Sequence, residues 1–321
     1  MSPASKPFAP SAPRCVLERV SKWYGPVIGL NDVTLEISSG ITGLVGHNGA
    51  GKSTLIKLMT GLLRPSLGLV RVAGHDAWSA AARRHVGYCP DSDAFYEEMS
   101  GRAFVRTMAR LHGFTRQQAA RRAEEVLAQV RMTDRAARPL GSYSKGMRQR
   151  IKLAQALVHD PDLVVLDEPL NGVDPVGRIE LVELFRELSG QGKAILVSSH
   201  ILDELDTLAD RILFICRGRL LAAGPLDEVR ARLTDHPLQI RVATAGARRL
   251  AACLVPLDTV QTVDLKSEAE LVLRVRRSRE FFQQLAGVVA AEGFDIERLQ
   301  VVDASSEAVF DYLMQSANHP R

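Results

Sequence analysis

The sequence has 321 residues, a length that suggests one large or two ordinary domains. Its residues are 46% hydrophobic and 24% charged, which is typical of a globular protein. Its 41 basic and 37 acidic residues are interspersed and leave a net charge of only +4, which is too weak to indicate nucleic-acid binding. No apolar run approaches the ~18–20 residues of a membrane-spanning helix, which excludes an integral membrane protein. The four cysteines form no CxxC pair, so the sequence gives no sign of a zinc site, and the composition excludes a disulfide scaffold.

The first part of the chain predicts a short tail followed by strands and a helix. Residues 1–14 are rich in Pro, Ala and Ser and lack the apolar core of a signal peptide, so we expect a flexible tail, with removal by processing as the alternative. One strand is expected to start at residues 16–20 and another to end at 37–40, and further strands are expected over 41–45 and 69–72, with a helix over 53–63.

From residue 99 to about 160 the pattern changes to helix formers. Over 116–130 the apolar positions recur at helical spacing, as Ala120, Ala123, Val126, Leu127 and Val130. Short apolar strands return at 163–166 and 194–197, with an amphipathic helix expected over 180–188. Strands that alternate with helices predict an α/β domain over 15–224 with a parallel-rich sheet, into which the helical subdomain is inserted.

Residues 225–321 predict a second, small α+β domain. Gly224-Pro225 and His236-Pro237 mark breaks in the chain. The expected order is strand 238–242, helix 247–254, strands 260–265 and 270–275, helix 279–291, strand 296–302 and a last helix over 306–315. Its first six elements give the βαββαβ order of a ferredoxin-like arrangement. Because this domain carries no chemical motif, we expect a packing or dimer-stabilising role, with a sensor as the alternative.

Residues 46–53 (GHNGAGKS) fit the pattern GxxxxGK[ST] between an expected strand and an expected helix. The glycines allow successive N–H groups to face an anion, and the helix directs its positive dipole end at the same place. Lys52 adds a positive charge toward the β- and γ-phosphates, and Ser53 offers an oxygen to Mg²⁺. The alternative is a glycine-rich turn that binds nothing. The expected nucleotide-binding residues in this segment and directly after it are Gly46, Asn48, Gly49, Ala50, Gly51, Lys52, Ser53 and Thr54.

A second apolar strand, residues 163–166, ends in two carboxylates, Asp167 and Glu168. The carboxyl end of a buried strand is where ligands bind in open α/β sheets. We therefore expect Asp167 to hold Mg²⁺ and Glu168 to act as the general base on the attacking water. A carboxylate pair that caps the next helix is the alternative.

Further segments, in the same order and spacing, resemble the ATP-binding-cassette (ABC) ATPases over residues 16–224. Residues 143–150 (YSKGMRQR) resemble the family's signature motif, and 171–175 (NGVDP), with Asp174, resemble its D-loop. Residues 198–200 (SSH) resemble its switch-histidine segment, and 21–25 (SKWYG) its adenine-stacking loop with Tyr24. Taken alone, Tyr24 fits a core tyrosine and His200 fits a structural histidine.

The resemblance implies a P-loop nucleotide hydrolase fold and an ATPase that uses ATP and Mg²⁺, with Glu168 and His200 as catalytic residues. It also implies a head-to-tail homodimer or heterodimer, in which the signature residues complete the nucleotide site of the partner: Ser144, Lys145, Gly146 and Met147. The subgroup that it resembles consists of exporters with separate, multi-spanning permease subunits. The chain is then expected to lie at the cytoplasmic face of a membrane, to bind no nucleic acid and to power transport by ATP-driven dimer closure.

Three positions depart from the family pattern. Asp91 stands where the family usually has a glutamine; it can still contact the metal and the nucleotide, but it cannot donate a hydrogen bond. Lys145 replaces a glycine and could supply charge to the nucleotide of the partner, whereas Met147 replaces a glutamine and loses its polar contact. The alternatives are a soluble ABC ATPase acting on nucleic acid or ribosomes, and an adaptor built on a degraded cassette, which the intact Lys52 and Glu168 disfavour.

Overall fold

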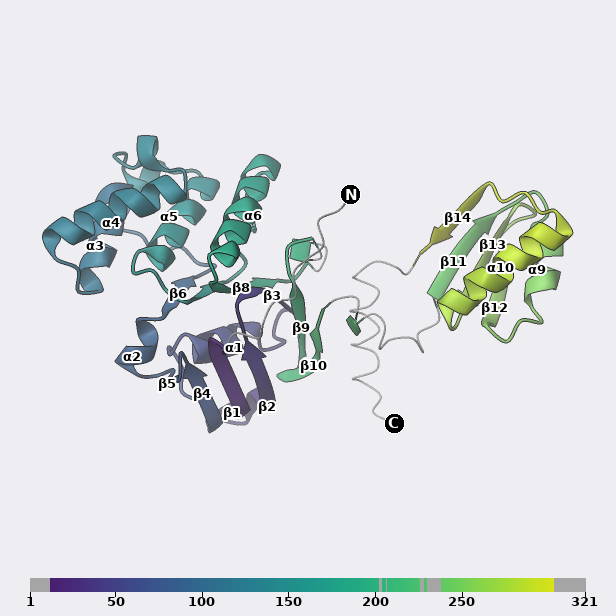
Figure 1. The fold of residues 1–321 in the computed structure, drawn as a ribbon, viewed down its shortest axis with the longest axis horizontal. Helices are drawn as coiled ribbons and strands as arrows, with labels where there is room; N and C mark the ends of the chain where they lie inside the picture. Colours follow the sequence, from purple (N-terminus) through teal and green to yellow (C-terminus); the bar gives the residue numbers. More distant parts are fainter. Residues whose placement is uncertain (1–11, 202–203, 206, 226–227, 230–237, 303–321) are drawn as a thin grey trace. The chain divides into compact units, whose positions relative to one another are not determined.

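The computed structural model describes residues 12–201, 204–205, 207–225, 228–229 and 238–302. The chain divides into two compact units, residues 1–223 and 224–321, which are described separately (Figure 1). Among the described residues no helix has the length and apolar character needed to cross a membrane.

The first unit is built on a six-stranded sheet whose order is β10-β9-β3-β8-β7-β6. Its strands are β3 (Gly40–Val45), β6 (Val86–Cys89), β7 (Leu163–Leu166), β8 (Ala194–Ser199), β9 (Arg211–Cys216) and β10 (Arg219–Gly224). The pairs β6–β7, β7–β8, β8–β3 and β3–β9 are all parallel. The carboxyl ends of five strands therefore share one edge of the sheet, as a parallel-rich α/β fold requires.

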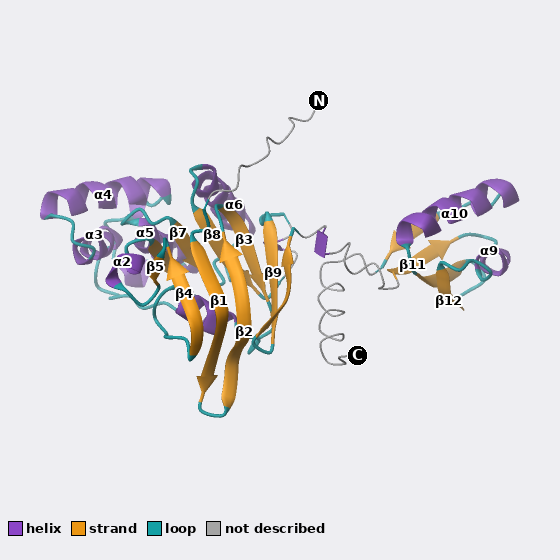
Figure 2. Cartoon of the chain, turned by 60° about the horizontal axis from the view of Figure 1, so that its bottom comes forward, coloured by secondary structure: helices purple, strands orange, loops and turns teal. Residues whose placement is uncertain are grey.

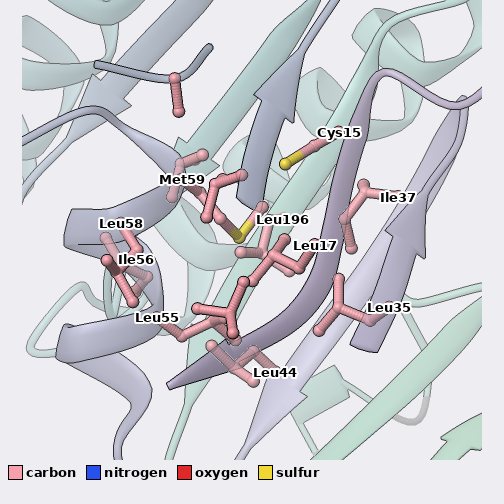
Figure 3. Close-up of a cluster of buried hydrophobic side chains, with 14 of the residues drawn as sticks. Cys15, Leu17, Leu35, Ile37, Leu44, Leu55, Ile56, Leu58, Met59 and Leu196 are labelled. Carbon is pink, nitrogen blue, oxygen red and sulfur yellow. The ribbon is translucent and has the colours of Figure 1, made fainter. Parts of the chain in front are cut away.

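A second, antiparallel sheet has the order β2-β1-β4-β5. It consists of β1 (Cys15–Tyr24), β2 (Val27–Ile37), β4 (Leu67–Val72) and β5 (His75–Asp76). Helix α1 (Lys52–Met59) contributes Leu55, Ile56, Leu58 and Met59 to one buried core with side chains of both sheets, such as Leu17 and Leu196 (Figure 3). This core fixes the start of α1 against the end of β3, where the glycine-rich segment lies.

Between β6 and β7 the chain is helical, and Figure 2 shows α3, α4 and α5 grouped on one flank of the strands. The helices are α3 (Gly101–Leu111), α4 (Arg116–Gln129) and α5 (Lys145–Leu157), preceded by the short α2 (Ala80–Arg83). Side chains cap each N-terminus, since Ser100, Thr115 and Ser144 accept hydrogen bonds from the first turns of α3, α4 and α5. Short 3₁₀ turns at Thr133–Arg135 and Leu140–Ser142 connect α4 to α5.

The helix α6 (Pro175–Gly190) follows β7 and packs on β3 and β8. It starts at a proline, a residue whose fixed φ suits the first helical position. On α4, Ala119 is buried together with Ala123, Val126 and Leu127, so the expected apolar face is present but includes Ala119 in place of Ala120.

The second unit is a four-stranded antiparallel sheet of order β12-β13-β11-β14. Its elements are β11 (Leu238–Ala243), α9 (Ala247–Leu254), β12 (Val260–Leu265), β13 (Glu270–Val275), α10 (Ser278–Glu292) and β14 (Arg298–Val301). Both helices contribute side chains to one core with the sheet, including Leu250 and Phe281. This order confirms the predicted βαββαβ, ferredoxin-like arrangement. The helix expected over 306–315 lies outside the described residues.

Several element ends differ from the sequence analysis. Gly40, expected to end a strand, begins β3, because β2 ends at Ile37 and the chain bends at Ser39. Arg14, assigned to the tail, is bonded to the antiparallel sheet, since its backbone N–H donates to Ile37 O at 2.7 Å and its carbonyl accepts from Ala73 N at 2.9 Å. Residues 1–11 lie outside the described part of the chain.

Candidate active site

The segment between β3 and α1 folds as a loop in which Gly46 and Gly51 are required for different reasons. Gly51 adopts φ 112° at the N-terminus of α1, a left-handed conformation that side chains rarely adopt. A Cβ on Gly46 would lie 2.5 Å from the carbonyl oxygen of Ile215, so this glycine is required for close approach of β9 and not for its own φ. The loop therefore lies between the start of α1 and strand β9.

Lys52, the first residue of α1, is 7% exposed and points back into this loop. Its Nζ donates to Gly46 O at 2.5 Å and lies 3.8 Å from Glu168 Oε1. Burial lowers the pKa of Lys52, and the nearby carboxylates of Glu168 and Asp167 oppose that shift. The ammonium is therefore a partly desolvated cation beside two carboxylates.

Asp167 and Glu168 leave the end of β7 and are held by the next strand. Ser198, fully buried on β8, donates through Oγ to Asp167 Oδ1 at 2.7 Å and accepts from the backbone N–H of Glu168 at 2.9 Å. The backbone N–H of Asp167 donates to Cys89 O at 2.9 Å. Burial is the main cause that raises the pKa of Asp167, and the hydrogen bond from Ser198 opposes it. Ser198 thus fixes the carboxylate of Asp167 and the backbone of Glu168, a role that was not expected from the sequence.

Glu168 lies against His200, with Glu168 Oε2 and His200 Nδ1 2.8 Å apart. The Glu168 side chain is 15% exposed and the His200 side chain 48% exposed. Glu168 has φ 48°, a left-handed conformation that costs a non-glycine residue about 1–3 kcal/mol. The strained backbone of Glu168 lies where its carboxylate contacts both Lys52 and His200.

Tyr24 lies at the end of strand β1, not in a loop, because Tyr24 pairs with Val27 across the turn into β2. Its hydroxyl lies 3.5 Å from Thr54 Oγ1, and the residue is 45% exposed. A Cβ on Gly29 would lie 2.7 Å from the ring, so a glycine there makes space for the aromatic side chain. The tyrosine is half-exposed and therefore free to stack on a planar ligand.

These residues line one open cavity of about 390 Å³. Its walls are Tyr24, Val27, Ile28, Gly29, His47, Asn48, Gly49, Gly51, Lys52, Ser53, Thr54, Asp91, Asp167 and Glu168. The cavity brings together most of the predicted nucleotide-binding residues from β1, the glycine-rich loop, β6 and β7. Gly46 and Ala50 belong to the loop, and His200 reaches the cavity through its contact with Glu168.

The segment that carries Asp91 is tied to α5 by a buried lysine. Lys152 is 4% exposed, and its Nζ donates to Asp91 O at 2.7 Å and lies 3.1 Å from Asp93 Oδ1. One turn earlier on α5, Arg148 makes two hydrogen bonds to Glu97, at 2.8 and 2.6 Å. Sequence reasoning missed this link, because basic residues on a helix ordinarily indicate a solvated face.

The signature residues Ser144, Gly146 and Met147 line a different hollow, of about 380 Å³, which shares no lining residue with the first. It is lined by Arg131, Met132, Asp134, Arg135, Ser144, Gly146, Met147, Arg150, Val173, Asp174, Val176, Gly177 and Glu180. Asp174 caps α6 by accepting from Gly177 N at 2.9 Å, as Ser144 caps α5. Helix α5 already begins at Lys145, so Gly146 lies in its first turn and not before it.

Two of the departures from the family pattern have visible contacts. A Cβ on Gly172 would lie 2.2 Å from Lys145 Nζ, so the lysine side chain rests on the segment 171–175 of its own chain. Met147 Sδ lies 3.7 Å from Arg135 Nη1. The structure thus places the signature residues beside Asp174 and apart from Lys52 and Asp167.

The comparisons with known proteins agree with this geometry. A family model described as ABC transporter matches residues 30–171. The daunorubicin resistance ATP-binding protein DrrA3 of Streptomyces coeruleorubidus is 34% identical over 303 residues, which cover 92% of this chain and 94% of that protein. The linearmycin resistance ATP-binding protein LnrL of Bacillus subtilis is 30% identical over 300 residues, which cover 91% of this chain and 96% of that protein.

A solved structure, of an ATP-binding subunit of an ABC transporter, is 31% identical with a TM-score of 0.63, and the match covers 68% of this chain and 92% of that one. The resemblance stated from the motifs is therefore confirmed, and so is the predicted fold of the first unit. The chain belongs to the ABC transporter family as an ATP-binding subunit, an ATPase whose hydrolysis of ATP is coupled to transport.

Proposed function

We propose that this ATPase powers an exporter whose multi-spanning permease subunits are separate chains, and that it acts as a peripheral subunit at the cytoplasmic face of the membrane. Two relatives that match over most of this chain are named for resistance to daunorubicin and to linearmycin, and export is the activity by which a transporter subunit would give resistance. The signature variant in residues 143–147, with Lys145 and Met147, supports the same subgroup.

The observation that carries the proposed chemistry is the convergence of Lys52, Glu168 and His200 within one set of contacts. Glu168 Oε2 lies 2.8 Å from His200 Nδ1, and Glu168 Oε1 lies 3.8 Å from Lys52 Nζ. The glycine-rich loop and Lys52 hold the phosphates, and Tyr24 stacks on the adenine. Glu168 takes the proton of the attacking water, and His200 orients Glu168 and contacts the γ-phosphate.

The residues at the cavity also fit a magnesium ion. Ser53, Asp91 and Asp167 offer one hydroxyl and two carboxylates, which are the oxygen ligands that a hard cation prefers. Among the described residues no group of three or more His, Cys, Asp or Glu side chains is placed to hold a metal ion by itself. Bound there, Mg²⁺ would neutralise charge that develops on the transferred phosphoryl group.

The separation of the two hollows supports a head-to-tail dimer. Each chain holds one phosphate loop and one signature segment, and Ser144 and Asp174 lie at a hollow that excludes the phosphate loop. A second copy or a similar subunit would place its own signature residues over the nucleotide: Ser144, Lys145, Gly146 and Met147. ATP then closes the dimer and hydrolysis loosens it, and this motion drives the permease. The C-terminal unit has its own core and carries a packing or dimer-stabilising role.

The catalytic assignment is tested with Glu168→Gln and Lys52→Ala in the full chain. We expect Glu168→Gln to bind ATP normally and to hydrolyse it at least ~10²-fold more slowly, because the amide cannot accept the proton. Lys52→Ala is expected to lose ATP binding. Glu187→Gln, an exposed position on α6, serves as the matched control and retains both properties. Hydrolysis at the normal rate by Glu168→Gln would remove the proposed base.

The partner assignment is tested by affinity purification of the tagged full chain from its native membrane fraction. We expect co-purification of a multi-spanning membrane protein. Recovery with ribosomes or DNA would support the soluble nucleic-acid class of ABC ATPase and overturn the transport assignment.

A further inference from the structure

Glu204 is a partly buried carboxylate that the catalytic roles above do not use. Its side chain is 14% exposed. Its Oε1 accepts from Arg178 Nη1 at 2.7 Å, and its Oε2 accepts from Ser199 Oγ at 2.9 Å. Among the described residues Arg178 is the one cation within ion-pair distance. Because a carboxylate that has lost much of its contact with water is stabilised by partners of this kind, the position of Glu204 depends on both residues.

Arg178 makes its second contact with the D-loop, residues 171–175. Its Nε donates to Val173 O at 3.0 Å, and its backbone N–H donates to Asp174 O at 2.9 Å. The planar guanidinium therefore holds the D-loop with one edge and Glu204 with another. A lysine at this position could keep the charge, but it could not hold both partners in a fixed geometry.

The side chain of Ser199 holds the backbone around the catalytic His200. Its hydroxyl donates to Glu204 and accepts from the backbone N–H of Ile201 at 3.0 Å, so the backbone on both sides of His200 is fixed to one oxygen. His200 in turn lies 2.8 Å from Glu168. A continuous set of contacts thus runs from the D-loop through Arg178, Glu204 and Ser199 to the histidine.

We propose that Arg178 and Glu204 are positioning residues that hold His200 against Glu168 and make that alignment depend on the D-loop. The inference deepens the proposed function and rests on it. If closure of the dimer displaces Val173 and Asp174, the guanidinium moves with them and the turn around His200 follows. The state of the D-loop therefore sets whether Glu168 is aligned for hydrolysis, whereas ATP binding itself is unaffected.

The test measures kcat and KM for ATP, and ATP affinity, in the full chain with Arg178→Gln, Glu204→Gln and the double variant. We expect each single variant to lower kcat about tenfold while KM and ATP affinity change less than about twofold, because only the alignment of the base is lost. The double variant is expected to be no slower than either single one, since all three break the same link.

Three further variants keep the test independent of folding. Ser199→Ala removes the link at its far end without leaving a charge unpaired, and we expect it to lower kcat several-fold. Compared with Arg178→Gln, Arg178→Lys is expected to recover thermal stability but not kcat. If the salt bridge were merely structural, kcat would recover together with thermal stability. The control is Arg186→Gln, on the same helix, whose side chain donates to Thr207 O at 2.7 Å and touches neither Glu204 nor the D-loop; it is expected to keep the normal kcat.

The inference is overturned if Arg178→Gln and Glu204→Gln hydrolyse ATP as fast as Arg186→Gln, or if their losses multiply in the double variant. It is also overturned if kcat recovers fully in Arg178→Lys. These outcomes leave the proposed function intact, provided that the unmodified chain hydrolyses ATP. Absence of hydrolysis in the unmodified chain would instead refute the proposed function itself.

Discussion

His159, which follows α5, is a partly buried base that resists protonation. Its ring stacks face to face on His112, with ring centroids 3.8 Å apart and planes 5° apart. Its Nε2 lies 3.0 Å from Val86 O and must carry the proton, because a carbonyl only accepts. Nδ1 is buried and has no partner among the described residues. Burial, helped by the charge of a protonated His112, lowers the pKa of His159 to about 4.

This shift makes stability depend on pH with a definite sign. The ordinary pKa of histidine is 6.5, so below that pH the unfolded chain binds a proton that the folded chain refuses until about pH 4. The contribution of His159 is fully present above pH 6.5 and is lost as the pH falls toward 4. Between pH 7 and pH 5 the two pKa values predict a loss of about 2 kcal/mol in the free energy of unfolding.

The perturbation that tests this is His159→Gln, whose amide can still donate to Val86 O but cannot titrate. Urea unfolding is followed by tryptophan fluorescence at pH 7 and pH 5, since both tryptophans, Trp23 and Trp78, lie in the first unit. We expect the unmodified chain to lose about 2 kcal/mol more than the variant over this interval. The exposed His75→Gln serves as the control and keeps the original pH dependence. Equal losses in His159→Gln and in the unmodified chain would show that His159 does not cause this pH dependence.

Three further predictions follow from packing. Gly87→Ala places a Cβ 2.1 Å from Ala156 O, a backbone atom that cannot easily give way, so the midpoint of urea unfolding should drop by an amount that corresponds to about 1–3 kcal/mol. Gly29→Ala pushes on the Tyr24 ring, and titration calorimetry should show about tenfold weaker ATP binding at unchanged thermal stability, within the ~1–3 kcal/mol of aromatic stacking. Phe281→Ala, a fully buried residue of the second core, should cost the second unit about 3–5 kcal/mol; circular dichroism should show an earlier transition, while tryptophan fluorescence and ATP hydrolysis stay normal.

The parts of the site that the sequence predicted are those that lie close together along the chain. The glycine-rich loop is flanked directly by the apolar strand β3 and by α1, so strand, loop and helix are each visible within a few residues. Asp167 and Glu168 follow β7 without a gap. The ferredoxin-like order was predictable because each strand of the second unit has its own short apolar pattern bounded by turns.

The parts that could not be predicted depend on contacts between distant segments. Ser198 reaches Asp167 only because β8 lies beside β7, where Leu166 pairs with Val197. The role of Lys152 likewise depends on α5 packing under the segment after β6, which no local pattern reveals. Tyr24 extends β1 because β2 pairs with it, and cross-strand pairing of this kind overrides the turn signal of the neighbouring glycine.

The strand order of the first unit constrains how the protein can be made. Strand β3, which leads into the phosphate loop, lies between β8 and β9, and Gly40 pairs with Ala194. A ribosome adds ~5–20 residues per second. The phosphate loop is therefore synthesised many seconds before β8 and β9, the two strands that pair with β3. In ribosome-stalled chains of increasing length, nucleotide binding should therefore begin only when Cys216, at the end of β9, has left the ribosome. The strands of the second unit, in contrast, all come from one short stretch of the chain and can pair as soon as that stretch has been synthesised.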